Sequence, residues 1–313
     1  MSPAVLAALP ARGRWDFGDF RYGLEPLVLP EPLRQGQRGG PPGRHRDAES
    51  ADLLRELGAL PPCRLDTPPA DDPEQLFWFR WITGHQATFA LWQCLARSLN
   101  DAQAEPARRG PVEAMTRLVR AYTAMLLYTG SCSIDLYHEV IRPSMYLQHR
   151  GFSGAWAPDF SPLRRLLRGR PFPWADTPHG AALGREVQAY QDVHMGIAAR
   201  LVPGGRSLLQ ETAAQTRLLH PEMRAVVYDN YFLTLRAPVG DAEVTRQLVR
   251  RLKAIALDVT DNGLYPGRGD ADLPPELRTP TVLARERAFT ETVTGLAALV
   301  TGAQGGEPCD TEC

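Results

Sequence analysis

The sequence has no excess of charge of either sign, and this excludes two classes of partner. Its 35 basic residues nearly balance its 36 acidic ones, for a formal net charge of −1, and Lys253 is the only lysine. Proteins that bind nucleic acids or anionic membranes do so through an excess of positive charge. We therefore expect neither nucleic acid nor a membrane surface as a partner.

Long hydrophobic runs and paired cysteines are also missing. No stretch approaches the roughly 20 apolar residues of a transmembrane helix, and the first residues lack the basic region of a secretory signal. The five cysteines are odd in number and scattered, which indicates no disulfide framework. Motifs of phosphate-binding loops, serine hydrolases and metalloproteases are absent too. Together these absences predict a cytoplasmic protein.

Helical periodicity dominates what is present. With 313 residues, 43% of them hydrophobic, the chain can bury a large core. The pattern predicts an all-α fold, with helices at about 48–58, 73–101, 108–130, 133–147, 180–202, 207–219, 221–235, 240–259 and 281–302. Strand patterns are sparse, and residues 226–233 are the most ambiguous segment. We expect a Pro-, Gly- and Arg-rich N-terminal segment (1–47), a helical domain (48–302) and a frayed tail (303–313).

One helix is apolar almost all the way round and carries a histidine in its middle. At helical spacing, a single face holds Trp78, Trp81, His85, Phe89 and Trp92. A buried indole N–H needs a partner, so three tryptophans around an imidazole make an unusual core but a suitable wall for a flat aromatic guest. His85 is therefore a candidate for moving protons, and an ordinary core histidine is the alternative.

A second histidine, His194, lies on the apolar face of the helix expected over 180–202, and we expect its imidazole to point inward. Gly196 and the alanines after it give this part of the helix small side chains. Small side chains suit axial ligation of a planar metal cofactor, which must lie against the helix. Similarly, Gly84 lets a bulky group approach the helix of His85 closely, at a cost in helix stability. The alternative for His194 is a core histidine bonded to a carbonyl.

Arg142 ends the helix that begins at Ser133, directly before Pro143. An arginine at a helix C-terminus is usually solvated and favoured by the helix dipole. As a functional group, its fork of donors would hold a carboxylate. The irregular, aromatic-rich span 148–178 follows, and segments of this kind are more often functional than idle. Its Phe152 and Trp156 would then fold over the ligand.

Three stretches, in this order, resemble the heme-dependent tryptophan 2,3-dioxygenases. Residues 81–92, Trp-Ile-Thr-Gly-His-Gln-Ala-Thr-Phe-Ala-Leu-Trp, are similar to the distal-histidine helix of that family. Residues 120–154 are similar in layout to the segment that ends in a carboxylate-binding arginine and a glycine-containing turn. Residues 192–201, Asp-Val-His-Met-Gly-Ile-Ala-Ala-Arg-Leu, are similar to its proximal helix, whose histidine ligates the heme iron.

Details of the second stretch resemble more closely the heme-dependent L-tyrosine hydroxylases of natural-product pathways, which share the dioxygenase core. These details are Ile-Arg-Pro-Ser-Met at 141–145 and Gly-Phe-Ser-Gly-Ala-Trp-Ala-Pro-Asp at 151–159. The resemblance implies a tryptophan 2,3-dioxygenase-like helical domain with His194 as the axial ligand of heme iron and His85 in the distal pocket. The residues expected to contact the substrate are Arg142, Trp81, Phe152 and Trp156.

The resemblance also implies a reaction. L-Tyrosine or a close analogue would be hydroxylated to a 3,4-dihydroxyphenyl product, with hydrogen peroxide as the oxidant. A related branch attaches heme through a His-x-x-x-Cys motif, which this chain lacks, so a non-covalent heme b is implied. The dioxygenases are oligomeric, which implies a homo-oligomer. Two alternatives stay open: an indole or tryptophan oxygenase that uses dioxygen, and a non-catalytic helical protein that binds a ligand or senses through heme.

Overall fold

The structure is a computed structural model that describes residues 25–33, 51–52, 54–55, 72–202, 206–212, 219–266 and 275–302. The described part is mostly helical, which confirms the predicted fold class. None of its helices is long and apolar enough to cross a membrane. The expected tail, 303–313, and most of the expected helix at 48–58 lie outside the described residues.

The helices follow the predicted order, with shorter elements between them. The α-helices are α3 (Pro73–Ala104), α4 (Arg109–Thr129), α5 (Ile134–Leu136), α6 (Arg142–Gln148), α7 (Arg164–Leu167), α8 (Pro178–Leu201), α9 (Leu208–Thr212), α10 (Pro221–Tyr231), α11 (Asp241–Asn262), α12 (Pro280–Arg287) and α13 (Phe289–Val300). The described residues also include the π-helix η2 (Tyr137–Ile141) and the 3₁₀ helices η3 (Gly154–Trp156), η4 (Pro158–Leu163) and η7 (Pro275–Leu277). Two strands, β1 (Leu27–Leu29) and β2 (Thr234–Arg236), were not predicted.

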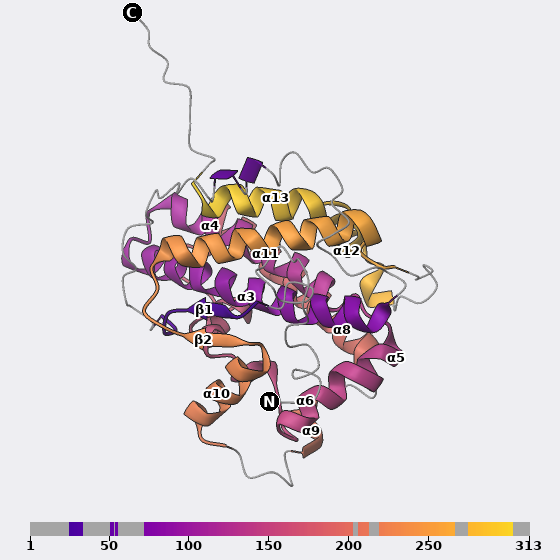
Figure 1. Ribbon diagram of the computed structural model, residues 1–313. Helices are drawn as coiled ribbons and strands as arrows, with labels where there is room; N and C mark the ends of the chain where they lie inside the picture. The colour runs from indigo at the N-terminus through magenta and orange to yellow at the C-terminus, as the bar shows by residue number, and fades with distance from the viewer. Residues whose placement is uncertain are drawn as a thin grey trace, which may run out of the picture.

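The long helix α3 is the centre of the described fold. Asp72 caps its N-terminus by accepting a hydrogen bond from the backbone N–H of Gln75, and Pro73 occupies the first turn, where its missing N–H costs nothing. Helices α4 and α11 pack against α3, and α4 also packs against α8. In Figure 1, α11 and α13 lie above α3, whereas the strand pair and α10 lie below it. Since neighbours cover it on several sides, α3 is apolar almost all the way round.

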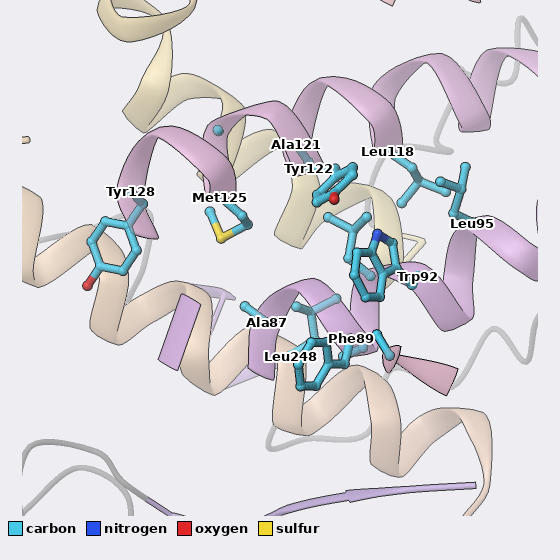
Figure 2. Packing of buried hydrophobic residues seen from close by; sticks show 14 of the residues in the cluster. Ala87, Phe89, Trp92, Leu95, Leu118, Ala121, Tyr122, Met125, Tyr128 and Leu248 are labelled. Carbon is cyan, nitrogen blue, oxygen red and sulfur yellow. The ribbon is translucent and has the colours of Figure 1, made fainter. Parts of the chain in front are cut away.

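Gly84 sets how closely α3 and α4 approach. A Cβ at this position would lie 2.5 Å from Cγ2 of Thr129 and 3.0 Å from Cδ1 of Tyr128. The bulky group expected to approach this glycine is therefore helix α4. Further along α3, toward its C-terminus, the contact with α4 is aromatic. Figure 2 shows Trp92 of α3 facing Tyr122 of α4. Their ring centroids are 5.3 Å apart in an edge-to-face arrangement.

A buried charge pair joins α3 to α11. The guanidinium of Arg80 makes two hydrogen bonds to the carboxylate of Asp258, at 2.7 and 2.9 Å, and both side chains are fully buried. It also donates to Ser131 Oγ and to the carbonyl oxygens of Gly263 and Leu264. A buried charge is tolerated only when it is paired and hydrogen-bonded in this way. The network therefore fixes the position of α3 relative to α11.

A pair of short strands, which the sequence did not indicate, joins the N-terminal segment to the rest of the described fold. Strand β1 lies within residues 1–47, pairs in parallel with β2, and buries Leu27 and Leu29 completely. Gln247 of α11 anchors the middle of β1 through hydrogen bonds with both backbone groups of Val28, at 2.8 and 2.9 Å. Three residues are too few to show strand alternation in a sequence. Tertiary contacts, rather than the local pattern, therefore create this strand pair.

Two glycines provide a matched test of the packing between α3 and α4. Alanine is favoured over glycine inside a helix by about 1 kcal/mol. We expect Gly184→Ala, in an exposed position of α8 with no neighbour within 4 Å, to stabilise the protein by about 0.5–1 kcal/mol. We expect Gly84→Ala to destabilise it by roughly 1–3 kcal/mol, because the new methyl group overlaps α4. Urea denaturation gives both free energies of unfolding, and equal stability of the two variants would contradict the close approach.

Candidate functional site

His85 lies in the middle of a cluster of aromatic rings. Its ring centroid is 4.3 Å from that of Trp81, 6.2 Å from that of Phe89, and 4.4 Å from that of Phe232, on which it stacks. Trp81 and Phe89 come from the same face of α3, as the helical spacing predicted, and Phe232 follows α10. The residue is only partly exposed to solvent. His85 is thus enclosed by aromatic surface, with few polar neighbours to stabilise a charge.

The hydrogen bonding of His85 fixes its tautomer. Nδ1 lies 2.6 Å from the backbone carbonyl oxygen of Trp81. A carbonyl oxygen can only accept, so Nδ1 carries the proton and Nε2 of the neutral ring keeps its lone pair. Burial lowers the pKa of His85 to about 4, and the hydrogen bond to Trp81 only partly opposes this shift. At neutral pH the side chain is therefore a neutral base whose accepting atom is Nε2.

Sequence reasoning missed the aromatic residues of α10 and Phe232 directly after it, the ring that stacks on His85. Phe232 contacts Tyr228 and Tyr231 of α10, at 4.9 and 4.7 Å between ring centroids, and all three are buried. Their spacing of three and four residues is the signal of one helix face. The signal was masked because residues 226–233 also suit a strand. The rings of α10 therefore cover part of the wall that the sequence suggested for an aromatic guest.

A glutamine beside His85 holds this aromatic cover in place. The Gln86 side chain donates hydrogen bonds to the carbonyl oxygens of Phe232, at 2.9 Å, and of Glu25, at 3.1 Å. Its own oxygen accepts a hydrogen bond of 2.9 Å from Arg251 of α11. All these groups lie in the interior, where unpaired polar atoms are costly. Gln86 of α3 thus fixes the position of Phe232 over the His85 ring.

The three tryptophans of α3 differ in how their indole N–H groups are satisfied. Trp81 donates to the hydroxyl of Tyr231, at 3.0 Å, and this hydroxyl also lies 2.7 Å from Oγ of Ser144. The indole nitrogens of Trp78 and Trp92 are buried without a hydrogen-bond partner. An orphaned buried donor costs free energy. Two of the three tryptophans therefore have the unpaired indole N–H that made this set of residues unusual for a core.

Arg142 begins a helix rather than ending one, which corrects the prediction. The chain turns from α5 through the π-helix η2 into α6, and the N–H of Arg142 bonds to the carbonyl of Tyr137, five residues earlier. A proline in a regular α-helix clashes with the carbonyl four residues before it. The wider π turn relieves this clash at Pro143, and π turns are frequent at functional sites. Arg142 is thus placed at a widened turn next to Tyr137.

The guanidinium of Arg142 has two acceptors. Its Nη2 lies 2.8 Å from Oε2 of Glu211 in α9, and the side chain of Arg142 is only 15% exposed. Arg142 also hydrogen-bonds the hydroxyl of Tyr137, and this bond and the positive charge oppose the effect of burial, which raises the pKa of Tyr137. The Tyr137 ring centroid is 6.4 Å from that of Trp81. Arg142 is therefore connected to His85 through Tyr137 and Trp81, and its acidic partner was not foreseen.

Phe152 and Trp156 lie in the irregular span after α6, and both are buried. Phe152 stacks on Tyr228, with 5.5 Å between centroids and 11° between planes, and it contacts Phe232 at 6.4 Å. Trp156 packs on Phe152 at 5.7 Å. Phe152 is thus one ring removed from His85, behind Phe232, and Trp156 is one ring further away. The loop therefore belongs to the same aromatic cluster, on its outer side.

His194 is exposed, which corrects the expectation that its imidazole points inward. On the same predicted face of α8, Leu183, Val187 and Tyr190 are buried, and Ile197 is partly buried. The pKa of His194 is nevertheless lowered because surrounding protein desolvates the ring. An accessible imidazole with a lowered pKa is neutral at pH 7 and has a lone pair available for a metal. The adjacent Met195 is 63% exposed and offers apolar surface, so this part of α8 suits a planar metal cofactor, which needs one axial imidazole.

Aromatic rings connect the two histidines. From His194 the path runs to Tyr190 at 6.0 Å, to Tyr122 at 4.9 Å and to Trp92 at 5.3 Å. From Trp92 it continues to Phe89 at 5.6 Å and then to His85. Helix α4, which carries Tyr122, packs against both α3 and α8. Four rings lie between the two predicted histidines along this path, so the structure places them on separate helices of one aromatic core without direct contact.

Part of the chain matches the model of a known family. Residues 46–183 match the model of the family described as SfmD 3-methyl-L-tyrosine peroxygenase. The matched stretch contains His85, Arg142, Phe152 and Trp156, and it ends before His194. No curated protein matches the chain.

The lowered pKa of His85 gives a prediction for the pH dependence of stability. The unfolded chain has a histidine pKa near 6.5 and binds the proton more readily than the folded chain, whose value is about 4. Stability contributed by the neutral ring is therefore complete above about pH 7 and is lost as the pH falls toward 4. We expect His85 to account for a loss of about 2 kcal/mol between pH 7.5 and pH 5.

Urea denaturation of the wild type and of His85→Gln at both pH values isolates this contribution. The difference in stability between pH 7.5 and pH 5 should be smaller in the variant, because its side chain does not titrate. The exposed His220 provides the control: His220→Gln should leave the pH dependence as in the wild type. If His85→Gln also leaves the pH dependence of stability as in the wild type, the imidazole of His85 is not a desolvated neutral base.

Proposed function

We propose that this chain, whose residues 46–183 match the model of the SfmD 3-methyl-L-tyrosine peroxygenase family, is an oxidoreductase of natural-product biosynthesis with a specific reaction. Peroxygenases of this family are heme-dependent and use hydrogen peroxide. The proposed reaction adds an oxygen atom next to the phenolic hydroxyl of L-tyrosine, or of a ring-substituted analogue such as 3-methyl-L-tyrosine. The product is a catechol.

The observation that carries the proposal is the state of His85. The ring is neutral, its Nδ1 proton is held by the carbonyl of Trp81, and Nε2 accepts. Such a group can take a proton from hydrogen peroxide and return it to the departing oxygen, or it can accept the phenolic hydrogen bond of the substrate. Both tasks need a base that stays neutral at the working pH. The aromatic surroundings of His85 ensure this and also suit a flat phenol ring.

His194 is the residue that we propose to hold the heme iron. Its accessible, neutral imidazole and the adjacent exposed Met195 fit an axial ligand beside an apolar macrocycle. The group is proposed to be a non-covalent heme b, because no histidine of the chain has a cysteine four residues after it. Heme, when bound, supplies the redox chemistry by which peroxide oxidises the ring. The protein supplies position, exclusion of water and proton transfer.

Arg142 is proposed to bind the carboxylate of the amino acid. Its guanidinium is mostly buried and is held by Glu211 and Tyr137. A contact this far from the reacting carbon contributes binding energy that positions the ring. Trp81, which lies between Tyr137 and His85, is proposed to line the path of the substrate ring. Phe152 and Trp156 are proposed to close the outer side of the site.

We expect His194→Ala to lose the heme absorption of the wild type. The physical reason is the loss of the axial imidazole, for which alanine offers no donor. The absorption spectrum and the heme content of protein expressed with a heme precursor are the measurements. His179→Ala changes a histidine in the first turn of the same helix and should retain heme. Stoichiometric heme with an unchanged spectrum in His194→Ala would assign the axial ligand to another residue.

We expect His85→Gln to retain heme and to lose turnover of L-tyrosine by a factor of about 10² or more, the usual contribution of a positioned general acid–base group. Catechol formation with peroxide, monitored by chromatography, is the measurement. Near-normal turnover would make His85 a core residue only. Product that depends on dioxygen, or turnover of tryptophan in place of tyrosine, would favour an indole or tryptophan oxygenase instead.

A further inference from the structure

Glu211 lies beside Arg142, the residue proposed to bind the carboxylate of the amino acid. Its Oε2 is 2.8 Å from Nη2 of Arg142, and its side chain is 45% exposed, so it keeps access to solvent and to a ligand. In the substrate, the carbon bearing the ammonium is bonded directly to the carboxylate carbon. A carboxylate held by Arg142 therefore brings the ammonium into the neighbourhood of Arg142, and Glu211 supplies negative charge there.

The charges of this pair match an amino acid better than a simple acid. Arg142 and Glu211 together carry no net charge, as does the zwitterion. A guanidinium has five N–H donors, so Arg142 can accept a second carboxylate while it keeps its bond to Glu211. A lone arginine would bind every phenolic carboxylic acid of similar size. An arginine beside a carboxylate favours a ligand in which a positive group accompanies the negative one.

The pair is also connected to the reactive end of the site. Arg142 hydrogen-bonds Tyr137, the Tyr137 ring contacts Trp81, and Trp81 lies against His85. The polar pair and the neutral base are therefore at two ends of one aromatic surface. A tyrosine side chain has the same layout, with its charged groups at one end and its hydroxyl at the other.

From these contacts we infer that Glu211 is a specificity-determining residue that binds the substrate α-ammonium and restricts the enzyme to free α-amino acids. The inference rests on the proposed function of Arg142. It extends that function by naming a second recognition group, on α9, a short helix that follows the helix of His194.

Three ligands distinguish the contribution of the ammonium group to binding from that of the carboxylate. L-Tyrosine has both charged groups, 3-(4-hydroxyphenyl)propanoate lacks the ammonium, and tyramine lacks the carboxylate. Isothermal titration calorimetry on the heme-loaded full chain gives Kd for each ligand without turnover. For Glu211→Gln we expect Kd to rise roughly fivefold to tenfold for L-tyrosine and for tyramine, because a charge-assisted hydrogen bond is lost at a partly exposed position. The Kd of 3-(4-hydroxyphenyl)propanoate should change by less than about twofold, because this ligand has no ammonium to lose contact with Glu211.

Glu222→Gln is the matched control, because it removes the same charge from an exposed position of α10, and it should leave all three constants unchanged. Two results for Glu211→Gln would overturn the inference. Tighter binding of both carboxylates would show that Glu211 competes with the substrate for Arg142. Equal weakening of all three ligands would show a role in local structure only.

Failure of the proposed function is distinguishable from failure of this inference. It would appear in the wild type, as an absence of L-tyrosine binding, and would overturn both. A wild type that binds L-tyrosine together with a Glu211→Gln variant that binds it equally well would overturn only the role of Glu211.

Discussion

The rotation of α3 about its own axis is the constraint on which the rest of the site depends. Arg80 and Asp258 form a fully buried, doubly hydrogen-bonded charge pair between α3 and α11. Gln86 makes a second set of buried hydrogen bonds, to Arg251 and to the carbonyl of Phe232. Rotation of α3 would leave these groups buried without partners, at a high cost in free energy. The face that carries Trp81, His85 and Phe89 is thereby directed toward α10.

This constraint explains how an apolar helix can hold a functional histidine. The polar contacts that fix the position of α3 are made by Arg80 and Gln86, and none of them is made to the His85 imidazole. Around His85 the protein supplies aromatic rings and one backbone carbonyl. The imidazole is therefore kept neutral by desolvation and kept in one tautomer by Trp81. An ordinary core histidine would also be desolvated, but this one lies within the stretch that matches a peroxygenase family model, and a neutral base has chemical use in the reaction proposed here.

Much of the helical fold was predictable because apolar periodicity is a local property. Helices α3, α4, α8 and α11 lie close to their predicted bounds, and one face of α3 holds the aromatic residues as expected. The strand pair was not predictable, because three-residue strands have no readable alternation and Gln247 of α11 fixes β1. The π turn before Arg142 follows from Pro143, yet a sequence shows only that the helix must be disturbed there.

The side-chain surroundings of the site were harder to predict than its elements. His194 lies on a face of α8 that is otherwise buried, and the sequence cannot show that this position of the face is open. Glu211 is far from Arg142 along the chain, so their ion pair depends on how α9 packs. The rings of α10 were visible as a spacing of three and four residues but were ambiguous with a strand. The exposure of His194 and the ion pair of Glu211 depend on how distant elements pack, whereas the ambiguity of α10 was local.

In the proposed reaction the oxygen added to the tyrosine ring comes from hydrogen peroxide. The decisive experiment is the reaction of the holoenzyme with L-tyrosine and ¹⁸O-labelled hydrogen peroxide under unlabelled dioxygen. We expect a catechol whose mass shows one ¹⁸O atom taken from the peroxide. A catechol that carries only unlabelled oxygen, with label appearing when ¹⁸O-labelled dioxygen is supplied instead, would contradict it.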